Sequence, residues 1–414
     1  MDKILLRGEL SGTVVPPCSK SYAQRALAVS LLADGETTLR NVDFCNDTLS
    51  AISCIETLGA TVRREGERML VVRGGLKPQG DTLRVGESGL ATRLFTPIAS
   101  LCSMPITIAG EGTLLYRPMN MMIEPLRHLG VEVRDGGGLL PIEVCGPIRG
   151  GEVAVDGSVS SQFITGLLLA LPLAEEDTTI HVANAVSKPY IDMTIDMAAQ
   201  FGVEISHNNY EEFFVEGQRT YEATDVAIEG DWSAAAALLV AGAVAGRVTV
   251  ENLSMLSKQA DVAICEALVR AGVAVTSDCS SVTAERRDLV AFEFDATQCP
   301  DLFPALAALA AAAEGESVIY GTHRLEHKES NRAETLRSEY AKLGIDIRLE
   351  GDAMYIRGGA VGSGEVYSHG DHRIAMSLAI SALRADGEVL LRDAEVVSKS
   401  YPDFYEAIES LLVK

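Results

Sequence analysis

Apolar and polar positions along the chain alternate between a helical and a strand period, and this alternation is itself repeated. An apolar–Gly–apolar–x–apolar turn follows an amphipathic helical pattern five times, with its glycines at Gly59, Gly130, Gly202, Gly272 and Gly344. These glycines are 71, 72, 70 and 72 residues apart. In each copy we expect Gly to end a helix and the alternating residues after it to begin a strand.

A second series of helices lies between these turns. Helices rich in small residues are predicted to begin near Gln24, Ala91, Ser161, Ser233, Leu302 and His372. Each is followed by a strand-like run, and the regular spacing predicts six copies of a unit with about two helices and several short strands. The sixth copy ends early, while residues 4–8 resemble the strand ends at 70–74 and 354–358. We therefore expect the N-terminal strand to complete the sixth copy.

A chain of 414 residues is too long for one ordinary hydrophobic core. The repeat predicts two domains of three units each. One comprises 1–18 together with 229–414, and the other comprises 19–228. The chain would cross between them near 14–19 and 227–230, where no linker rich in Pro, Gly or Ser marks the boundary.

The charge balance is acidic, with 35 Lys+Arg against 58 Asp+Glu and a net charge of −23. Such a surface disfavours nucleic acid and anionic membranes as partners. The eight cysteines form no CxxC pair, which is typical of reduced thiols in a cytoplasmic protein. The opening residues resemble neither a signal nor a transit peptide. The longest apolar run, 234–246, is shorter than the ~20 residues of a membrane span and predicts a buried helix.

Five of the six helix starts in the second series carry a polar cluster. The clusters are Lys20-Ser21 with Arg25, Glu87-Ser88-Gly89 with Arg93, Ser160-Ser161-Gln162, Pro300-Asp301 and Asp371-His372-Arg373. If the first helix begins near Ser21, this serine caps it and Arg25 shares its face. A helix N-terminus with added cations suits a phosphate or carboxylate. Taken alone, the first cluster also fits an ordinary serine cap beside solvated charges.

In five of the six units the other helix has cations at or near its start, namely Arg117, Lys188, Lys258, Lys328, Arg332 and Lys399, whereas the first unit has Asn46-Asp47 there. The helix dipole disfavours cations there, and Lys328 and Arg332 at i,i+4 add a small repulsion. Their recurrence in an acidic protein indicates that equivalent ends of the units face a shared cleft that binds anions. Asp301 and Glu329 fit a general acid or base, or only a helix cap and a partner of Arg332.

Other chemistries find little support. The pair His323 and His327 lacks the Glu of a zinc-protease helix, so no metal is expected. No Ser nucleophile elbow, phosphate-binding P-loop or convincing dinucleotide motif occurs, so no organic cofactor is expected either.

The polar clusters together identify a resemblance. The chain resembles the 5-enolpyruvylshikimate-3-phosphate synthase family over nearly its whole length, and the matching motifs occur in the same order as in that family. Besides the clusters above, these motifs are Arg117-Pro118-Met119, Asp156-Gly157-Ser158, Ser187-Lys188-Pro189-Tyr190, Lys328-Glu329 with Arg332, and Lys399-Ser400-Tyr401-Pro402-Asp403. The resemblance implies an inside-out α/β fold of two domains, each with three βαβαββ units, and an active site in the interdomain cleft. It also implies transfer of the enolpyruvyl group of phosphoenolpyruvate to the 5-hydroxyl of shikimate 3-phosphate, with release of phosphate and no metal or organic cofactor.

The resemblance also assigns roles to residues of this chain. Shikimate 3-phosphate would be bound by Lys20, Ser21, Arg25, Ser160, Ser161, Gln162, Ser187, Asp301 and Lys328. Phosphoenolpyruvate would be bound by Lys20, Gly89, Arg93, Arg117, Gln162, Arg332, Arg373 and Lys399. Asp301 would be the base at the hydroxyl, and Glu329 would exchange protons with C3, assisted by Lys20.

Some positions depart from the family pattern: Cys18 replaces a common Gly, Glu87 a common Asn and Leu90 a usual Thr. Leu90 neighbours Gly89 and, with Glu87, bears on inhibitor sensitivity more than on the reaction. A UDP-N-acetylglucosamine enolpyruvyl transferase is the nearest alternative, but the loop at 110–116 lacks the reactive Cys usual there. A non-catalytic anion-binding protein would not need Asp301 together with Glu329. A monomer is expected.

Overall fold

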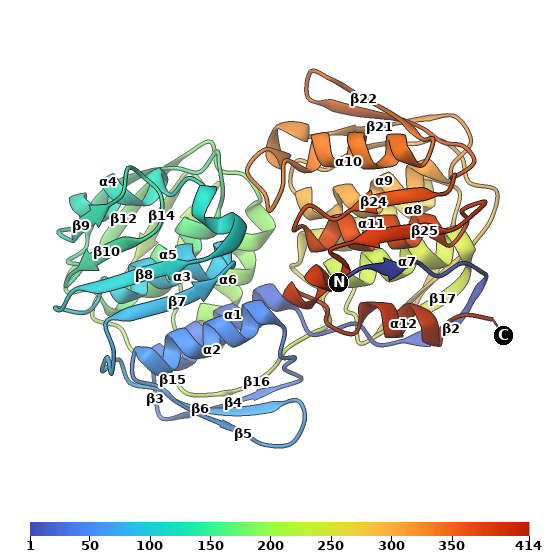
Figure 1. Cartoon of the computed structure of the whole chain (residues 1–414). Helices are drawn as coiled ribbons and strands as arrows, with labels where there is room; N and C mark the ends of the chain where they lie inside the picture. The colour runs from blue at the N-terminus through green and yellow to red at the C-terminus, as the bar shows by residue number, and fades with distance from the viewer. Residues whose placement is uncertain (414) are drawn as a thin grey trace. The chain divides into compact units, whose positions relative to one another are not determined.

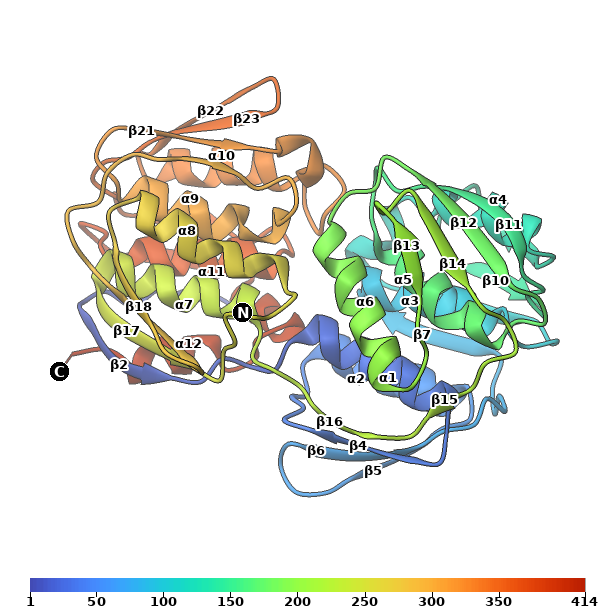
Figure 2. The same ribbon diagram turned by 180° about the vertical axis from the view of Figure 1, so that it is seen from behind.

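The computed structural model describes residues 1–413 and divides into two compact units. We call Met1–Pro17 with Glu229–Lys414 the C unit, and Cys18–Ile228 the N unit. The ribbon, coloured along the chain in Figure 1, shows that the C unit contains both the first and the last segments of the chain. Figure 2 shows the same ribbon from behind.

Each unit contains three sheets with one shared strand pattern, in which the first two strands are parallel and the following ones are antiparallel. In the N unit, the strands of the first sheet lie in the order β16 (Asp225–Ala227), β4 (Glu36–Arg40), β6 (Met69–Arg73) and β5 (Thr61–Arg64). Those of the second lie in the order β7 (Thr82–Gly86), β8 (Ile106–Gly110), β10 (Ile142–Cys145) and β9 (Glu132–Asp135). Those of the third lie in the order β11 (Gly151–Asp156), β12 (Thr178–Ala183), β14 (Glu212–Val215) and β13 (Ser206–Asn208). A further short pair joins β3 (Ala33–Asp34) to β15 (Tyr221–Glu222).

The C unit repeats the pattern. Its sheets are β2 (Leu10–Val14), β17 (Gly246–Glu251), β19 (Ser281–Glu285), β18 (Ala274–Ser277); β20 (Glu293–Asp295), β21 (Glu316–Tyr320), β23 (Ala353–Arg357), β22 (Asp346–Glu350); and β24 (Gly364–Tyr367), β25 (Val389–Arg392), β1 (Lys3–Ile4). Strand β1 lies antiparallel to β25, with Lys3 opposite Leu391. The paired strand is shorter than the predicted 4–8, although the Leu5 amide still donates to the Val389 carbonyl at 2.9 Å.

The two crossing segments supply strands that the sequence did not reveal. Strand β2 precedes the first crossing and lies parallel to β17, with Leu10 opposite Gly246. Strand β16 precedes the second crossing and lies parallel to β4, with Asp225 opposite Thr38. Each unit therefore obtains the first strand of one of its sheets from a segment distant in sequence.

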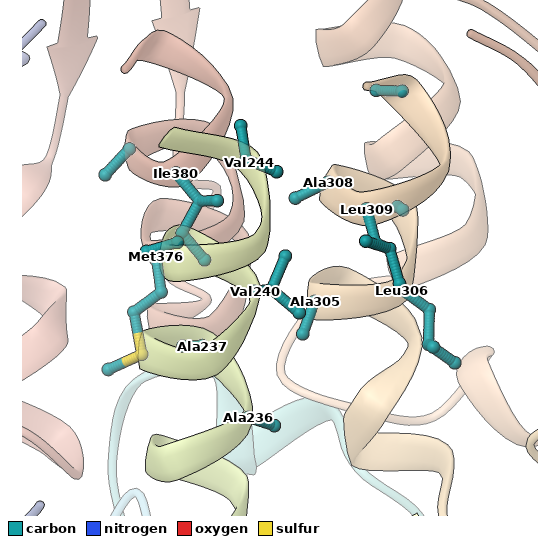
Figure 3. Close-up of a cluster of buried hydrophobic side chains, with 14 of the residues drawn as sticks. Ala236, Ala237, Val240, Val244, Ala305, Leu306, Ala308, Leu309, Met376 and Ile380 are labelled. Atoms are coloured by element: carbon teal, nitrogen blue, oxygen red, sulfur yellow. The ribbon is translucent and has the colours of Figure 1, made fainter. Parts of the chain in front are cut away.

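Three helices form the centre of each unit. They are α1 (Lys20–Leu32), α3 (Gly89–Ala99) and α5 (Gln162–Ala170) in the N unit, and α7 (Trp232–Ala245), α9 (Phe303–Ala311) and α11 (His372–Ala382) in the C unit. Every residue of α9 is buried, as expected for a helix that is apolar on all sides. In Figure 3, Val240 and Val244 of α7 lie toward Ala305 and Ala308 of α9. The predicted buried helix at 234–246 is thus confirmed as α7.

The second helix of each repeat is less buried. These helices are α2 (Asn46–Thr57), α4 (Asn120–His128), α6 (Lys188–Gln200), α8 (Ile264–Arg270), α10 (Arg332–Lys342) and α12 (Phe404–Ser410). No helix within residues 1–413 has the length and apolar composition needed to cross a membrane.

Some predicted helix starts are wrong in detail. Helix α12 begins at Phe404, so Lys399 precedes it at the end of a 3-10 helix. Helix α1 begins at Lys20, because Ser19 rather than Ser21 is its cap. Helix α8 begins at Ile264, after a 3-10 turn, rather than near Lys258. Helix α10 begins at Arg332, so Lys328 precedes it and the expected repulsion within one helix does not apply.

Candidate functional site

The start of α1 brings a cation to a buried position. The Ser19 hydroxyl accepts a hydrogen bond from the Tyr22 amide at 3.4 Å, which makes Lys20 the first helical residue. The Lys20 ammonium lies 3.0 Å from a carboxylate oxygen of Asp47, in the first turn of α2. Asp47 offsets the unfavourable interaction of this cation with the helix dipole. Since the Lys20 side chain is only 15% exposed, the alternative of a solvated charge is wrong.

Arg25 lies one turn further along α1 and is 1% exposed. Its guanidinium donates hydrogen bonds to the Thr194 hydroxyl at 2.9 Å, the Thr165 hydroxyl at 3.2 Å, the Tyr190 carbonyl at 2.9 Å and the Ser21 carbonyl at 2.8 Å. All four acceptors are neutral, and burial lowers the pKa of Arg25 to about 10. A buried cation without a carboxylate partner is costly, and an anionic ligand would offset that cost.

Two further guanidinium groups converge on the start of α3. Arg93 is 2% exposed and donates to the Gln162 side-chain oxygen at 3.0 Å and to the Pro118 carbonyl at 3.2 Å. A Cβ atom at Gly89 would lie 2.6 Å from Arg117 Nη1 and 3.0 Å from Arg93 Nη1, so a side chain there would displace the Arg117 guanidinium. Arg117 Nε is buried without a hydrogen-bond partner among residues 1–413. Two cations at a helix N-terminus form a suitable anion site.

The predicted serines lie at the starts of α5 and α6. The Ser160 hydroxyl accepts from the Gln162 amide at 3.2 Å, and Ser161 directly precedes α5. Ser187 precedes α6 with a φ of +53°, a left-handed conformation that is uncommon for a residue with a side chain and frequent at functional sites. The bonds from Arg25 to Thr165 and to Tyr190 join α1 to α5 and to α6, so these serines belong to the same group of helix starts.

In the C unit, Arg332 is the centre of a dense ionic cluster. This guanidinium is 1% exposed and contacts three carboxylates: Asp371 at 2.8 Å, Asp301 at 2.8 Å and Glu329 at 2.7 Å. Burial alone would lower the pKa of Arg332, but Asp371, Glu329 and Asp301 together raise it. Arg332 is therefore fully neutralised by this unit's own side chains.

Asp301 lies in the 3-10 turn Pro300–Leu302 before α9. Its oxygens contact Lys328 at 3.2 Å and Arg373 at 3.2 Å, in addition to Arg332. Burial would raise the pKa of Asp301, but these three cations hold it well below its usual range. A simple helix cap does not describe this carboxylate, because it is ionised and surrounded by cations.

Glu329 is 11% exposed, and its second oxygen lies 3.8 Å from the Lys399 ammonium. The contact with Arg332 confirms the pairing that the sequence offered as a structural alternative. Burial lowers the pKa of Lys328, while Asp301 acts in the opposite direction.

The structure gathers the predicted residues into two groups. The N-unit group is Lys20, Ser21, Arg25, Gly89, Arg93, Arg117, Ser160, Ser161, Gln162 and Ser187, and the C-unit group is Asp301, Lys328, Glu329, Arg332, Arg373 and Lys399. Their catalytic and binding roles stay predictions. Sequence reasoning missed Asp47 as the partner of Lys20, because an acidic residue in a first helical turn is commonplace. Among residues 1–413, no three His, Cys, Asp or Glu side chains gather as a metal site.

Comparisons with known proteins agree on one family. The family model for EPSP synthase (3-phosphoshikimate 1-carboxyvinyltransferase) matches residues 6–408. The 3-phosphoshikimate 1-carboxyvinyltransferase of Clostridium perfringens is 36% identical, covering 99% of this chain and 98% of its own. The enzyme of that name from Methanosarcina acetivorans is 38% identical, covering 99% and 97%.

The fold also has a solved counterpart. An EPSP synthase structure from Acinetobacter baumannii superposes with a TM-score of 0.85 and 25% sequence identity, covering 100% of this chain and 98% of its own. The predicted α/β fold of six repeats is confirmed by this likeness and by the shared strand pattern. Since the match of sequence and fold extends over nearly the whole chain, this protein belongs to the EPSP synthase (3-phosphoshikimate 1-carboxyvinyltransferase) family.

Proposed function

We propose that this chain transfers the enolpyruvyl group of phosphoenolpyruvate to the 5-hydroxyl of shikimate 3-phosphate and releases inorganic phosphate. Family membership and the names of the relatives support this activity. The reaction places the chain in the shikimate pathway. Its partners are then two small, multiply anionic substrates, which agrees with cations at helix starts in a chain of net charge −23.

The observation that carries the proposal is the arrangement of Asp301 and Glu329 around one guanidinium. Arg332 lies 2.8 Å from Asp301 and 2.7 Å from Glu329, so the two carboxylates face a common centre. An addition–elimination reaction needs two separate proton-transfer groups close to both substrates. A protein that only binds anions has no use for two carboxylates that compete with its ligand for Arg332.

In the proposed addition step, the 5-hydroxyl oxygen of shikimate 3-phosphate attacks C2 of phosphoenolpyruvate, and Asp301 accepts the proton of that hydroxyl. Glu329, in its protonated form, supplies a proton to C3, which becomes a methyl group as the double bond becomes single. In the elimination step, Glu329 takes a proton back from that methyl group, the double bond re-forms, and phosphate leaves. Asp301 then releases its proton to solvent or to the departing phosphate, which restores the starting carboxylate. Lys20 assists these transfers and stabilises the developing charge on the departing phosphate.

The low pKa of Asp301 constrains this scheme. With three cations around it, Asp301 is ionised but is a weak base. Anionic substrates that engage Lys328, Arg332 and Arg373 share those cations with Asp301 and thereby raise its pKa. Substrate binding itself then makes the carboxylate a better base, at the moment when a proton must be accepted.

In the N unit, we assign Arg25 with Ser160, Ser161 and Ser187 to shikimate 3-phosphate, and the pair Arg93 and Arg117 at Gly89 to phosphoenolpyruvate. Ser21 and Gln162 complete these two groups. The buried Arg25 with neutral partners and the convergent guanidinium groups at α3 support this division. We also propose that both units act as domains. Their boundaries would lie at 18/19 and 228/229, with one cleft between them.

A cytoplasmic location and a monomeric state complete the proposal. All eight cysteines carry free thiols, which supports a reducing compartment. Light scattering on the purified chain would test the monomer, and a mass of two chains or more would contradict it.

The deciding experiment measures inorganic phosphate released from phosphoenolpyruvate by the purified protein. We expect release only when shikimate 3-phosphate is present. A parallel reaction with UDP-N-acetylglucosamine should give none, and release with that acceptor alone would favour the other enolpyruvyl transferase.

A further inference from the structure

Asp261 is a buried carboxylate that the proposed mechanism does not use. It lies in the 3-10 turn Ala260–Ala263 before α8 and is 1% exposed. The Ser233 hydroxyl, at the start of α7, donates a hydrogen bond to its Oδ2. Its Oδ1 is buried and has no hydrogen-bond partner in the described part of the chain. A carboxylate with one unsatisfied buried oxygen is costly to ionise.

Four ionisable groups interact electrostatically with Asp261. They are Asp301 and the Cys299 thiol at the turn before α9, Arg373 of α11, and Asp231 before α7. Two of these groups, Arg373 and Asp301, contact each other at 3.2 Å, so Asp261 acts on a pair that belongs to the C-unit group. Neither the resemblance nor the repeat pattern marks this residue.

We propose that Asp261 is a positioning residue whose charge sets how tightly Arg373 holds the anionic substrate beside Asp301. The proposal rests on the proposed function, and it takes Arg373 as a ligand of phosphoenolpyruvate, as the family resemblance implies. Without a charge, Asp261 leaves Arg373 to be shared between Asp301 and the substrate. With a negative charge, Asp261 becomes a second anion that competes with phosphoenolpyruvate for the same cation.

The protonation of Asp261 falls in the physiological range. Burial, followed by repulsion from Asp301, raises the pKa of Asp261 to about 7, although Arg373 and the Ser233 hydroxyl oppose the shift. Asp261 is therefore mostly neutral below pH 7 and mostly ionised above it. The Michaelis constant for phosphoenolpyruvate should rise as the pH passes through this range. By linkage, an anion bound at Arg373 favours the protonated form of Asp261.

The test compares the pH dependence of the Michaelis constant for phosphoenolpyruvate in three forms between about pH 6 and 8.5. They are the wild type, Asp261→Asn and the control Asp386→Asn, which neutralises an exposed carboxylate in the same unit. From pH 6 to 8.5 the constant should rise roughly 3- to 10-fold more in the wild type than in Asp261→Asn. The ionisation of phosphoenolpyruvate itself is common to all three forms and cancels in the comparison.

A second variant, Ser233→Ala, removes the hydroxyl that stabilises ionised Asp261, so the pH midpoint should move upward. The inference is overturned if Asp261→Asn keeps the wild-type profile or changes only kcat. If Asp261→Asn does not fold, an unmoved midpoint in Ser233→Ala overturns it instead. The proposed function fails separately, when the wild type itself releases no phosphate with shikimate 3-phosphate.

Discussion

Arg25 in the N unit and Arg332 in the C unit are equally buried, at 1% exposure, but their surroundings are opposite. Arg25 donates only to hydroxyl and carbonyl oxygens, and burial lowers its pKa to about 10. Arg332 contacts three carboxylates, which raise its pKa despite burial. Within residues 1–413, Arg25 thus contacts no carboxylate, whereas Arg332 contacts three carboxylates with its single positive charge.

This difference separates two tasks. A buried guanidinium with neutral partners gains most from an anion that arrives, so the N unit is suited to substrate binding. A guanidinium that is already neutralised holds carboxylates in place and adjusts their basicity, so the C unit is suited to proton transfer. The following tests are arranged from the largest expected effect to the smallest.

Asp301→Asn removes the carboxylate that gives the C unit its chemistry. We expect kcat for phosphate release to fall by about 10²- to 10⁴-fold, because a general base is lost. Binding of shikimate 3-phosphate, measured by calorimetry, should be largely retained through the N unit. Asp386→Asn serves as the control and should keep wild-type turnover, and near-normal turnover in Asp301→Asn would remove this residue from the mechanism.

Arg332→Met and Arg25→Met form a matched pair that tests the comparison directly. Loss of Arg332 leaves buried Asp371 and its neighbours without their cation, which should lower the free energy of unfolding by about 3–5 kcal/mol. Loss of Arg25 removes a buried charge without a carboxylate partner, so stability should change little or increase. Urea unfolding measures both, and equal destabilisation of the two variants would refute the distinction.

The Arg25→Met variant has a second consequence for binding. Its affinity for shikimate 3-phosphate should fall by roughly 10- to 100-fold, because a charge-assisted contact to the ligand is lost. Calorimetric titration measures this loss. Unchanged affinity would show that Arg25 lies outside the binding site.

Gly89→Ala tests the anion site at the start of α3. The added Cβ would lie within 2.6 Å of Arg117 Nη1, so this guanidinium must move. The Michaelis constant for phosphoenolpyruvate should rise about 10-fold, with a smaller change for shikimate 3-phosphate. Gly75→Ala is a useful control for the added methyl, since no atom lies within 4 Å of its Cβ position, although its φ of +124° adds backbone strain.

Acidification should weaken the C unit through Asp301. The folded-state pKa of this group is depressed, so its contribution to stability is complete above the unfolded pKa of about 3.9 and is lost as the pH falls through the lower folded value. The difference in unfolding free energy between wild type and Asp301→Asn should therefore shrink below about pH 4. A constant difference down to pH 2 would contradict the role of the three cations.

Much of this architecture is predictable because each copy of the repeat carries the same short sequence patterns. The glycine that ends each helix and the alternation after it are local signals, and they located the six copies. The cations at helix starts were found because they violate the dipole rule. Partners such as Asp371 of Arg332 depend on how separate copies pack, and no local spacing encodes them.

The remaining errors have related causes. Ser19 and Ser21 are both competent caps, and in the structure the Ser19 hydroxyl is the one that accepts from a free amide of the first turn. Lys328 and Arg332 repel each other in a continuous helix, but the helix begins only at Arg332 and Asp301 contacts both cations. Asp261 carries no signal at all, because its surroundings come from α7, α9 and α11.

The hydrogen bonds beside the two points where the chain passes from one unit to the other have a consequence for engineering. Within the N unit, Asp43 accepts from the Cys18 amide at 2.5 Å, and the Asn41 side chain donates to the Ile228 carbonyl at 2.5 Å, so one loop ties both ends. Within the C unit, the Asp231 amide donates to the Pro17 carbonyl at 2.8 Å. The N unit is thus inserted into the sequence of the C unit, and the two C-unit segments that flank the insertion are hydrogen-bonded to each other. If the two units act as domains, as proposed, residues 18–228 can be expressed separately, and a short splice from Pro17 to Glu229 restores a continuous C unit.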